Sequence, residues 1–138
     1  MKLQILAKNK FTVAAVIVEK DEDTSPLIDF LYELPYQYQA SVGGISLIIE
    51  SIAEKGFEAL NTKQCHCVDK NNKIYELIKG AIRVFFFKGH CDVIVVATHG
   101  VIKKTQKTPK REIDIAIKYK KQYQQAHDSN NLLMTEDI

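Results

Sequence analysis

Long hydrophobic runs are missing from this 138-residue sequence. Its longest apolar stretches, such as "TVAAVIV" and "VIVVA", fall far short of the roughly 20 residues that a membrane-spanning helix needs. The first ten residues, "MKLQILAKNK", carry charge but have neither an extended apolar core nor a small-residue cleavage site. We therefore do not interpret them as a signal peptide, and we expect a cytoplasmic protein that has no membrane partner.

Cysteine is also scarce, with only Cys65, Cys67 and Cys91. An odd number of thiols in a chain of this length argues against a disulfide framework and fits a reducing compartment. The "CHC" motif invites a metal site, but its one-residue spacing differs from the two-to-four-residue gap of structural zinc sites. If this segment is a strand, Cys65 and Cys67 share one face and His66 takes the other. We expect no metal and no cofactor, and a metal-binding regulator is the competing hypothesis.

The composition that remains is that of a folded domain, with 46% hydrophobic and 26% charged residues, and it favours a single globular unit. The net charge of +2 is distributed unevenly. Residues 1–62 hold five cations and nine acids, whereas residues 63–138 hold 14 cations and eight acids. This asymmetry predicts a polyanionic partner for the basic half, and a simply solvated basic face is the alternative.

The first half of the chain predicts one strand and two helices. Residues 11–20 are rich in β-branched residues and predict a strand. Ser25 can cap a helix whose first residue is Pro26, and Pro35 can end it. Residues 41–56 predict a second helix, because isoleucines recur there at three- and four-residue spacing. The two helices are expected to form a hairpin that packs on a sheet.

The second half predicts three more strands and a helix. Residues 73–78, 81–87 and 92–98 are joined by short turns and predict an antiparallel meander. A last helix is expected from about Pro109 to Gln125, with Thr108 as its N-cap. The order β-α-α-β-β-β-α predicts an α+β fold, in which a small mixed or antiparallel sheet carries helices mainly on one face. Residues 1–126 are expected to form the domain, and residues 127–138 a disordered tail.

Arg83 stands in the middle of a predicted strand between apolar neighbours. Its side chain should share a face with Phe85 and Phe87, opposite to the even-numbered residues of the strand. Burying a guanidinium without a partner is costly. Either an acid, such as Glu76, therefore pairs with Arg83, or its face is an open anion-binding surface.

A group of cations lies between the last strand and the last helix: Lys103, Lys104, Lys107, Lys110 and Arg111. They repel one another and the positive end of the helix dipole, whereas a phosphate would bind both the cations and the free N–H groups of the helix. The segment thus predicts a phosphate-backbone site, with a solvated loop as the alternative.

His99 ends the predicted strand that precedes this basic segment. Its titration range suits general acid–base catalysis, although a structural role is the alternative.

Two segments resemble a known family of toxins. "YELIKGAIRVFFF" followed by "HGVIKKTQKTPKREIDIAIKYKKQY" resembles the HigB-like, phage-derived branch of the RelE superfamily. "SPLIDFLYELP" and "IAEKG" occur in the matching order upstream, so the resemblance covers about residues 11–124, and "KKTQKTP–E–A" is its most specific pattern. The resemblance implies a RelE-like fold and a toxin of a type II toxin–antitoxin system.

The resemblance also implies an activity and its partners. Such toxins are ribosome-dependent mRNA endoribonucleases that cut mRNA in the ribosomal A site and inhibit translation. A cognate helix-turn-helix antitoxin neutralises them and links them to DNA only indirectly. Cleavage by the RNA's own 2′-hydroxyl needs a base, an acid and cations for the growing phosphate charge, so the implied enzyme needs no metal.

Individual residues match the family in part. Arg83 matches the arginine near the scissile phosphate, His99 is the acid–base candidate, and Lys103 completes the expected catalytic set. The expected RNA-binding residues are Lys104, Lys107, Lys110, Arg111, Tyr75 and Lys79, and for Tyr75 a place in the core is the alternative. Where the branch commonly reads "ELR", this sequence has Glu76-Leu77-Ile78, so the arginine of the motif is replaced by isoleucine. Lys79 is a poor substitute, because it points to the other face of a regular strand. A non-catalytic RNA- or antitoxin-binding module is therefore the alternative function.

Overall fold

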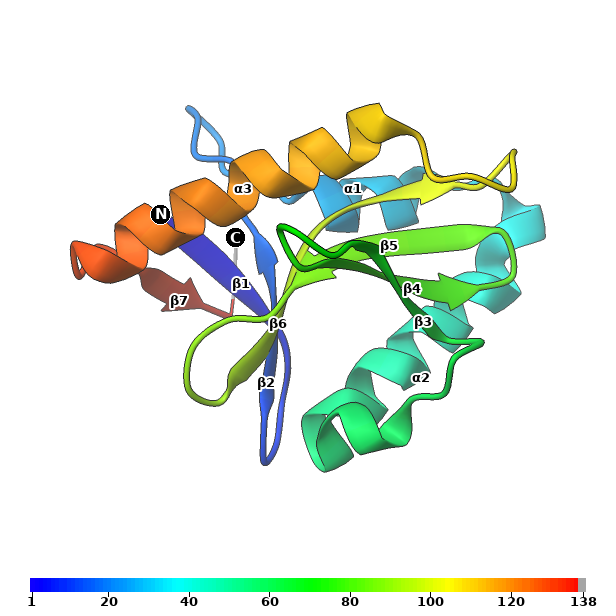
Figure 1. Ribbon diagram of the computed structural model, residues 1–138, viewed down its shortest axis with the longest axis horizontal. Coiled ribbons are helices and arrows are strands. Elements are labelled where there is room, and N and C mark those ends of the chain that lie inside the picture. The colour runs from blue at the N-terminus through cyan, green and yellow to red at the C-terminus, as the bar shows by residue number, and fades with distance from the viewer. Residues whose placement is uncertain (137–138) are drawn as a thin grey trace.

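The computed structural model describes residues 1–136 and contains one mixed sheet of seven strands with three α-helices (Figure 1). The elements are β1 (Lys2–Lys8), β2 (Thr12–Val16), α1 (Pro26–Glu33), α2 (Gln39–Lys55), β3 (Cys65–Asp69), β4 (Ile74–Lys79), β5 (Ile82–Phe87), β6 (Val93–Ile102), α3 (Lys110–Asp128) and β7 (Leu133–Thr135). The sheet order is β3-β4-β5-β6-β2-β1-β7. The predicted α+β class is confirmed.

The centre of the sheet is the predicted meander. β4 pairs with β5 and β5 pairs with β6, both antiparallel, as the short turns between them indicated. β6 then lies parallel to β2, which brings the two halves of the chain together in one sheet. Side chains on β5 alternate as expected, with Val84 and Phe86 in one core and Phe85 and Phe87 in the other.

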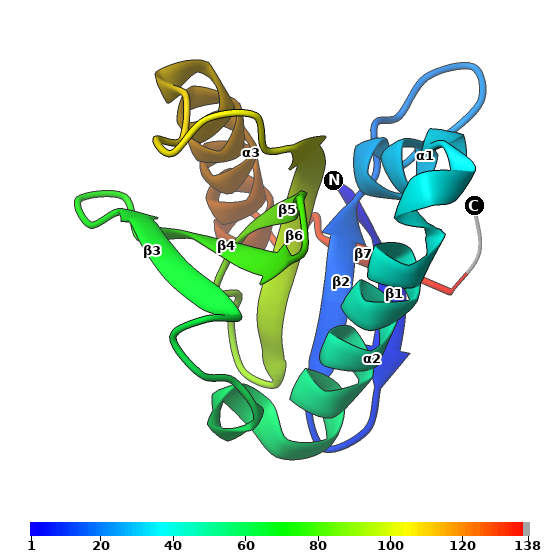
Figure 2. The ribbon, with the colours of Figure 1, turned by 90° about the vertical axis from the view of Figure 1, so that its right-hand side faces the viewer.

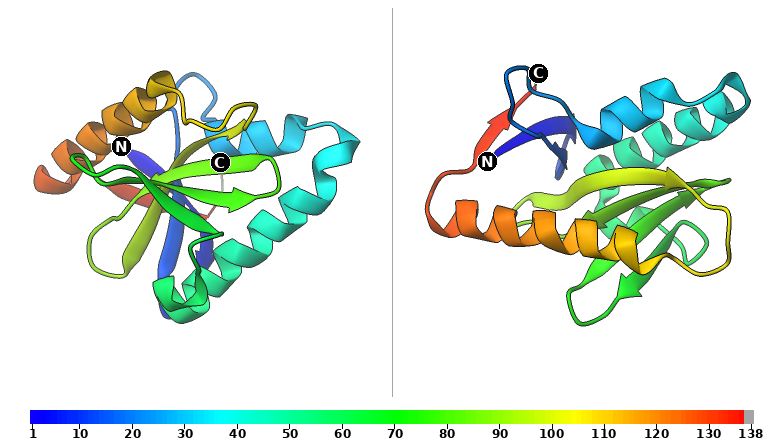
Figure 3. Two further views of the ribbon diagram at one scale, coloured as in Figure 1. Left: turned by 45° about the vertical axis from the view of Figure 1, so that its right-hand side comes forward. Right: turned by 90° about the horizontal axis from the view of Figure 1, so that it is seen from above.

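Two of the three α-helices lie on one face of the sheet, in line with the prediction that helices lie mainly on one face, and α3 is the exception. α1 and α2 cover one face of the sheet, whereas α3 runs along the opposite face (Figures 2 and 3). The physical reason lies in β5, because both of its faces are apolar and each must be buried. Tyr123 and Ala116 of α3 pack against the Phe85 and Phe87 side.

Three strands were not predicted as such: β1, β3 and β7.

The disorder expected for residues 127–138 is wrong for the described part of that tail. α3 continues to Asp128, and β7 pairs in parallel with β1. The Leu133 N–H donates to the carbonyl oxygen of Met1 at 2.9 Å. Residues 137 and 138 of the expected tail lie outside the described residues.

The helix ends follow the sequence at α1 but not at α3. Ser25 Oγ accepts a hydrogen bond from the Ile28 N–H at 3.3 Å, so the predicted N-cap is confirmed. Thr108 does not cap α3, because the helix begins one residue later than expected and Pro109 is its N-cap. The hydroxyl of Thr108 is instead directed at Glu76 of the sheet.

Within residues 1–136, every helix is too short or too polar to cross a membrane.

Candidate functional site

Two adjoining hollows lie where the loop between β6 and α3 (yellow in Figure 1) passes over the meander. The inner hollow has a volume of about 210 Å³ and is the more enclosed. It is lined by Glu76, Arg83, Phe85, Val101, Ile102, Lys103, Lys104, Thr105, Thr108, Pro109 and Glu112. The outer hollow, of about 410 Å³, is lined by Arg83, Lys103, Lys104, Thr105 and Gln106. Because four residues line both, the two hollows form one continuous site.

Arg83 stands at the junction of the hollows, and its side chain is only 14% exposed. Its Nη1 donates to the carbonyl oxygens of Gly80 at 2.7 Å and Ile82 at 3.0 Å. Its Nε lies 3.9 Å from Glu76 Oε1, an ion-pair distance that is too long for a hydrogen bond. The alternative in which Glu76 pairs with Arg83 is therefore confirmed, and Arg83 also lines both hollows.

Glu76 connects three parts of the chain around Arg83. Its carboxylate is 2% exposed. The Thr108 hydroxyl donates to Oε2 at 3.4 Å, and His66 Nδ1 lies 3.9 Å from Oε1. His66 is the residue directly opposite Glu76 in the β3–β4 pair. A buried carboxylate needs such partners, so Glu76 fixes the arginine, the edge strand and the loop before α3 relative to one another.

His99 lies behind the inner hollow and does not line it. Its ring stacks on Phe85 with centroids 4.9 Å apart, and Thr98 Oγ1 lies 2.9 Å from Nδ1. Nε2 is 3.5 Å from Glu112 Oε2, and Glu112 does line the hollow. Burial lowers the pKa of His99, although the negative charge of Glu112 opposes this shift.

The tautomer of His99 depends on where the Thr98 hydroxyl donates its one hydrogen, because the Phe85 carbonyl oxygen at 3.4 Å competes with His99 Nδ1 at 2.9 Å. When the hydroxyl donates to Nδ1, the hydrogen of a neutral imidazole is on Nε2 and is directed at the Glu112 carboxylate. The other tautomer would place a lone pair against that carboxylate. We infer that His99 holds Glu112 in position.

Ile78, where the resemblance places an arginine, is directly opposite Arg83 in the β4–β5 pair. The departure from the family pattern thus falls beside the junction of the hollows. Tyr75 and Lys79 do not join the site, because they lie on the α2 face of β4. Tyr75 stacks on Phe86 at 5.4 Å, and the Lys79 side chain lies so close over Gly44 of α2 that a Cβ there would be 2.5 Å from it.

Residues 29–121 match the family model described as phage-derived protein Gp49-like. The chain belongs to this Gp49-like family. The matched range begins within α1 and ends within α3, so it includes both hollows. Membership of the Gp49-like family supports a toxin-like role. A search of curated proteins found no match.

The remaining cations of the Gp49-like loop lie outside the hollows. Lys107, Lys110 and Arg111 are exposed around the start of α3. The Lys107 carbonyl accepts a hydrogen bond from the Thr105 hydroxyl at 3.0 Å, which closes the turn of the basic loop. These three exposed cations extend the positive surface beyond Lys103 and Lys104.

Sequence reasoning did not place Glu112 or Thr108 in the site. The one available signal was weak: an acidic residue in the first turn is favourable in any helix. Their roles depend on α3 folding back over β4 and β5, which local sequence does not specify. The conditional prediction for "CHC" is confirmed, because Cys65 and Cys67 face the α2 side while His66 faces Glu76.

Metal ligands are not grouped in the described part of the chain, where no three His, Cys, Asp or Glu side chains are placed to hold an ion. All three cysteines are free thiols. Burial raises the pKa of Cys65 to about 11, which makes this thiol a poor ligand and nucleophile at neutral pH.

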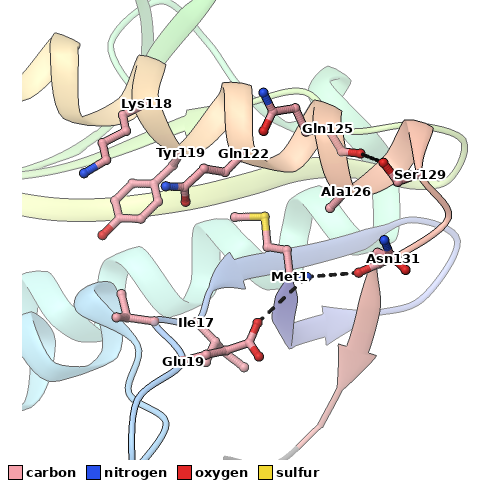
Figure 4. A pocket seen from close by; sticks show the side chains of 11 residues that line it. Met1, Ile17, Glu19, Lys118, Tyr119, Gln122, Gln125, Ala126, Ser129 and Asn131 are labelled. Atoms are coloured by element: carbon pink, nitrogen blue, oxygen red, sulfur yellow. Dashed lines mark hydrogen bonds and ion pairs between the residues drawn. The ribbon is translucent and has the colours of Figure 1, made fainter.

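A separate hollow of about 610 Å³ lies farther along α3, where Tyr119 and Gln122 line it together with Met1 (Figure 4). Its charges are mixed, because Lys118 and Glu19 both line it. The hydroxyl of Ser129 donates to the Gln125 carbonyl at 2.8 Å on its rim. It contains none of the cations of the basic loop, so the inner and outer hollows are the better candidates for an anionic ligand.

Proposed function

We propose that this Gp49-like protein is the toxin of a type II toxin–antitoxin system, of the HigB-like branch of the RelE superfamily, and that it cuts mRNA on the ribosome. The observation that carries the proposal is the outer hollow, where Arg83 of β5 meets Lys103 and Lys104 at the end of β6. Three cations from two segments of the chain line one space, an arrangement that suits the binding of a phosphate. That cleavage takes place in the ribosomal A site is inferred from the resemblance to the HigB-like branch.

In the proposed reaction, the 2′-hydroxyl of the RNA gives its proton to a water molecule and its oxygen attacks the adjacent phosphorus, while the bond to the 5′-oxygen breaks and a 2′,3′-cyclic phosphate is left. Negative charge grows on the phosphate oxygens during this step, and Arg83 stabilises it. Carbonyl groups already hold one side of the guanidinium, so Arg83 is oriented before RNA arrives. Lys103 supplies the proton to the leaving oxygen, Lys104 binds the neighbouring backbone, and His99 acts only through Glu112.

The proposed partners are mRNA on the ribosome and a helix-turn-helix antitoxin. The exposed cations Lys107, Lys110 and Arg111 would contact the ribosomal or messenger backbone in the cytoplasm, without sequence readout. An acidic segment of the antitoxin is expected to bind the same cations, so that antitoxin and RNA compete. DNA enters only through the antitoxin.

A non-catalytic RNA-binding or antitoxin-binding module is the second candidate. The observation that favours it is Ile78, which puts an aliphatic side chain opposite Arg83 where the branch has a second guanidinium. Loss of one cation weakens transition-state stabilisation more than it weakens binding to an extended backbone.

The test is a cleavage assay with programmed ribosomes, in which mRNA ends are mapped after adding the purified protein. We expect new ends with the natural protein and a loss of about 100-fold or more with Arg83→Gln, because oriented charge is removed from the transition state. Lys70→Gln, an exposed cation in the β3–β4 turn, is the matched control and should cut normally. RNA binding without any new ends would favour the second candidate.

A further inference from the structure

We propose that the inner hollow binds a single RNA base and prefers guanine, while the outer hollow binds the phosphate attached to that nucleotide. This inference rests on the proposed function, because it concerns which RNA the site selects. It assigns a role to the inner hollow, whose acidic residues would otherwise repel RNA.

The two hollows differ in polarity in the same way as the two parts of a nucleotide. Phe85, Val101 and Pro109 give the inner hollow apolar walls, and Glu112 gives it an acidic acceptor. The outer hollow has cations and no acid. A nucleotide likewise joins a flat, largely apolar base to an anionic phosphate. A phosphate alone would leave the inner hollow empty and its carboxylates facing negative charge.

Glu112 is the acceptor that is available to a base. Glu112 lines the inner hollow. Its Oε2 is buried 3.5 Å from His99 Nε2 and makes no hydrogen bond within residues 1–136, so a base would bind the side of the carboxylate that lines the hollow. The other carboxylate, Glu76, is already engaged by Thr108 and lies close to Arg83. A buried acceptor without a hydrogen bond gains the most when a ligand supplies donors.

Guanine is the base whose edge fits an ionised carboxylate. A carboxylate only accepts hydrogen bonds, and the Watson–Crick edge of guanine offers two adjacent donors, N1–H and the 2-amino group. Adenine and cytosine offer one amino donor beside an acceptor. Uracil flanks its single N–H with two carbonyl oxygens, which a carboxylate repels. The expected order of affinity is therefore guanine, then cytosine and adenine, then uracil.

Arg83 connects the two parts of the proposed nucleotide site, because it lines both hollows. A base that enters beside Phe85 has its own phosphate within the space that Arg83 and Lys103 enclose. Base selection and the scissile phosphate would then be read at neighbouring positions, so the bond that breaks would lie next to the selected guanine.

The first experiment measures binding of 5′-mononucleotides to the full chain by isotope-edited NMR titration at low salt. GMP should bind at least about tenfold more tightly than UMP, as expected for hydrogen bonds to a charged acceptor. IMP, which lacks only the 2-amino group, should lose most of that advantage. Equal affinities for GMP, IMP and UMP would overturn the proposal without any need for a variant.

Variants then locate the selectivity. Glu112→Gln should remove the preference for GMP over UMP, because the neutral amide binds the two donors of guanine less strongly and no longer repels the carbonyl oxygens of uracil. Glu54→Gln, an exposed acid on α2, is the control and should keep the preference. A Glu112→Gln protein that still selects GMP would refute the role of Glu112.

The cleavage assay separates this inference from the proposed function. Selective GMP binding without mRNA cleavage would leave the base site standing and remove the nuclease. Cleavage at all bases alike, together with equal affinities for the nucleotides, would support the nuclease and refute the base site. If both hold, mapped cuts should lie beside guanines, and Glu112→Gln should spread them over other bases.

Discussion

Replacing Gly100 by alanine tests the packing that supports the site. Gly100 lies in β6 directly after His99, and its position faces α1. An added Cβ would be 2.5 Å from Phe30 Cδ2, 2.7 Å from Phe30 Cε2 and 3.3 Å from the Arg83 carbonyl oxygen. Such distances are far shorter than a normal carbon–carbon contact of about 3.5–4.0 Å. The Phe30 ring or the strand must therefore move.

The expected magnitude follows from the size of this overlap. Adding a methyl group to a packed core costs typically about 1–3 kcal/mol, and we place Gly100→Ala in the upper half of that range because two ring atoms overlap with it. The melting temperature should fall by several degrees, at roughly 3–6 °C for each kcal/mol in a chain of this length.

Gly43 provides a control of opposite sign. It is exposed on α2, and an added Cβ there meets no atom within 4 Å. Gly43→Ala should therefore raise stability by up to about 1 kcal/mol through helix propensity alone. Thermal and urea unfolding of both variants, followed by circular dichroism, measures the difference.

A second substitution at Phe30 should partly rescue Gly100→Ala. Phe30→Leu removes the ring atoms that conflict with the new methyl group, so adding it to Gly100→Ala should cost less than it costs in the natural protein. This non-additivity is the signature of two residues in contact. A Gly100→Ala protein as stable as the natural one, or strictly additive effects, would show that α1 does not press on β6 as described.

Three further predictions concern charge and reactivity. Because burial lowers the pKa of His99 from its ordinary value of 6.5, the unfolded state binds the proton first, and stability should fall as pH drops below about 6.5; His99→Gln should flatten that part of the pH profile in urea unfolding. Lys104→Gln should reduce the salt dependence of single-stranded RNA binding by about 0.7 in log–log slope, whereas Lys70→Gln should leave the slope unchanged if that residue contacts no RNA. Cys65, with its pKa raised to about 11, should react with a thiol reagent at pH 8 far more slowly than the exposed Cys67, and equal rates by mass spectrometry would contradict its burial.

The meander and its alternation could be predicted because they depend on local signals. Short turns separate three β-branched segments, and the period of two then decides which side chains share the Arg83 face. Ser25 was predictable for the same reason, since its hydrogen bond spans three residues. These features need no knowledge of distant contacts.

The missed features all depend on contacts that are remote in sequence. β7 is a strand because β1 lies beside it, and β3 because β4 does. Thr108 fits the usual pattern of an N-cap, but its hydroxyl donates to a carboxylate 32 residues away. Tyr75 was assigned to RNA although it lies on the opposite face from Arg83, because the register that opposes Ile78 to Arg83 was unknown before the structure.

The carboxylate of Glu76 has a consequence for how any anion reaches this protein. It serves as a resident counter-ion, which keeps Arg83 ordered while the outer hollow is free of ligand. An arriving phosphate shares a guanidinium that is already oriented, so little side-chain entropy is lost on binding. The same negative charge weakens the attraction, which disfavours small weak anions. If the site binds RNA as proposed, this arrangement should therefore favour a densely charged sugar–phosphate backbone over a single carboxylate.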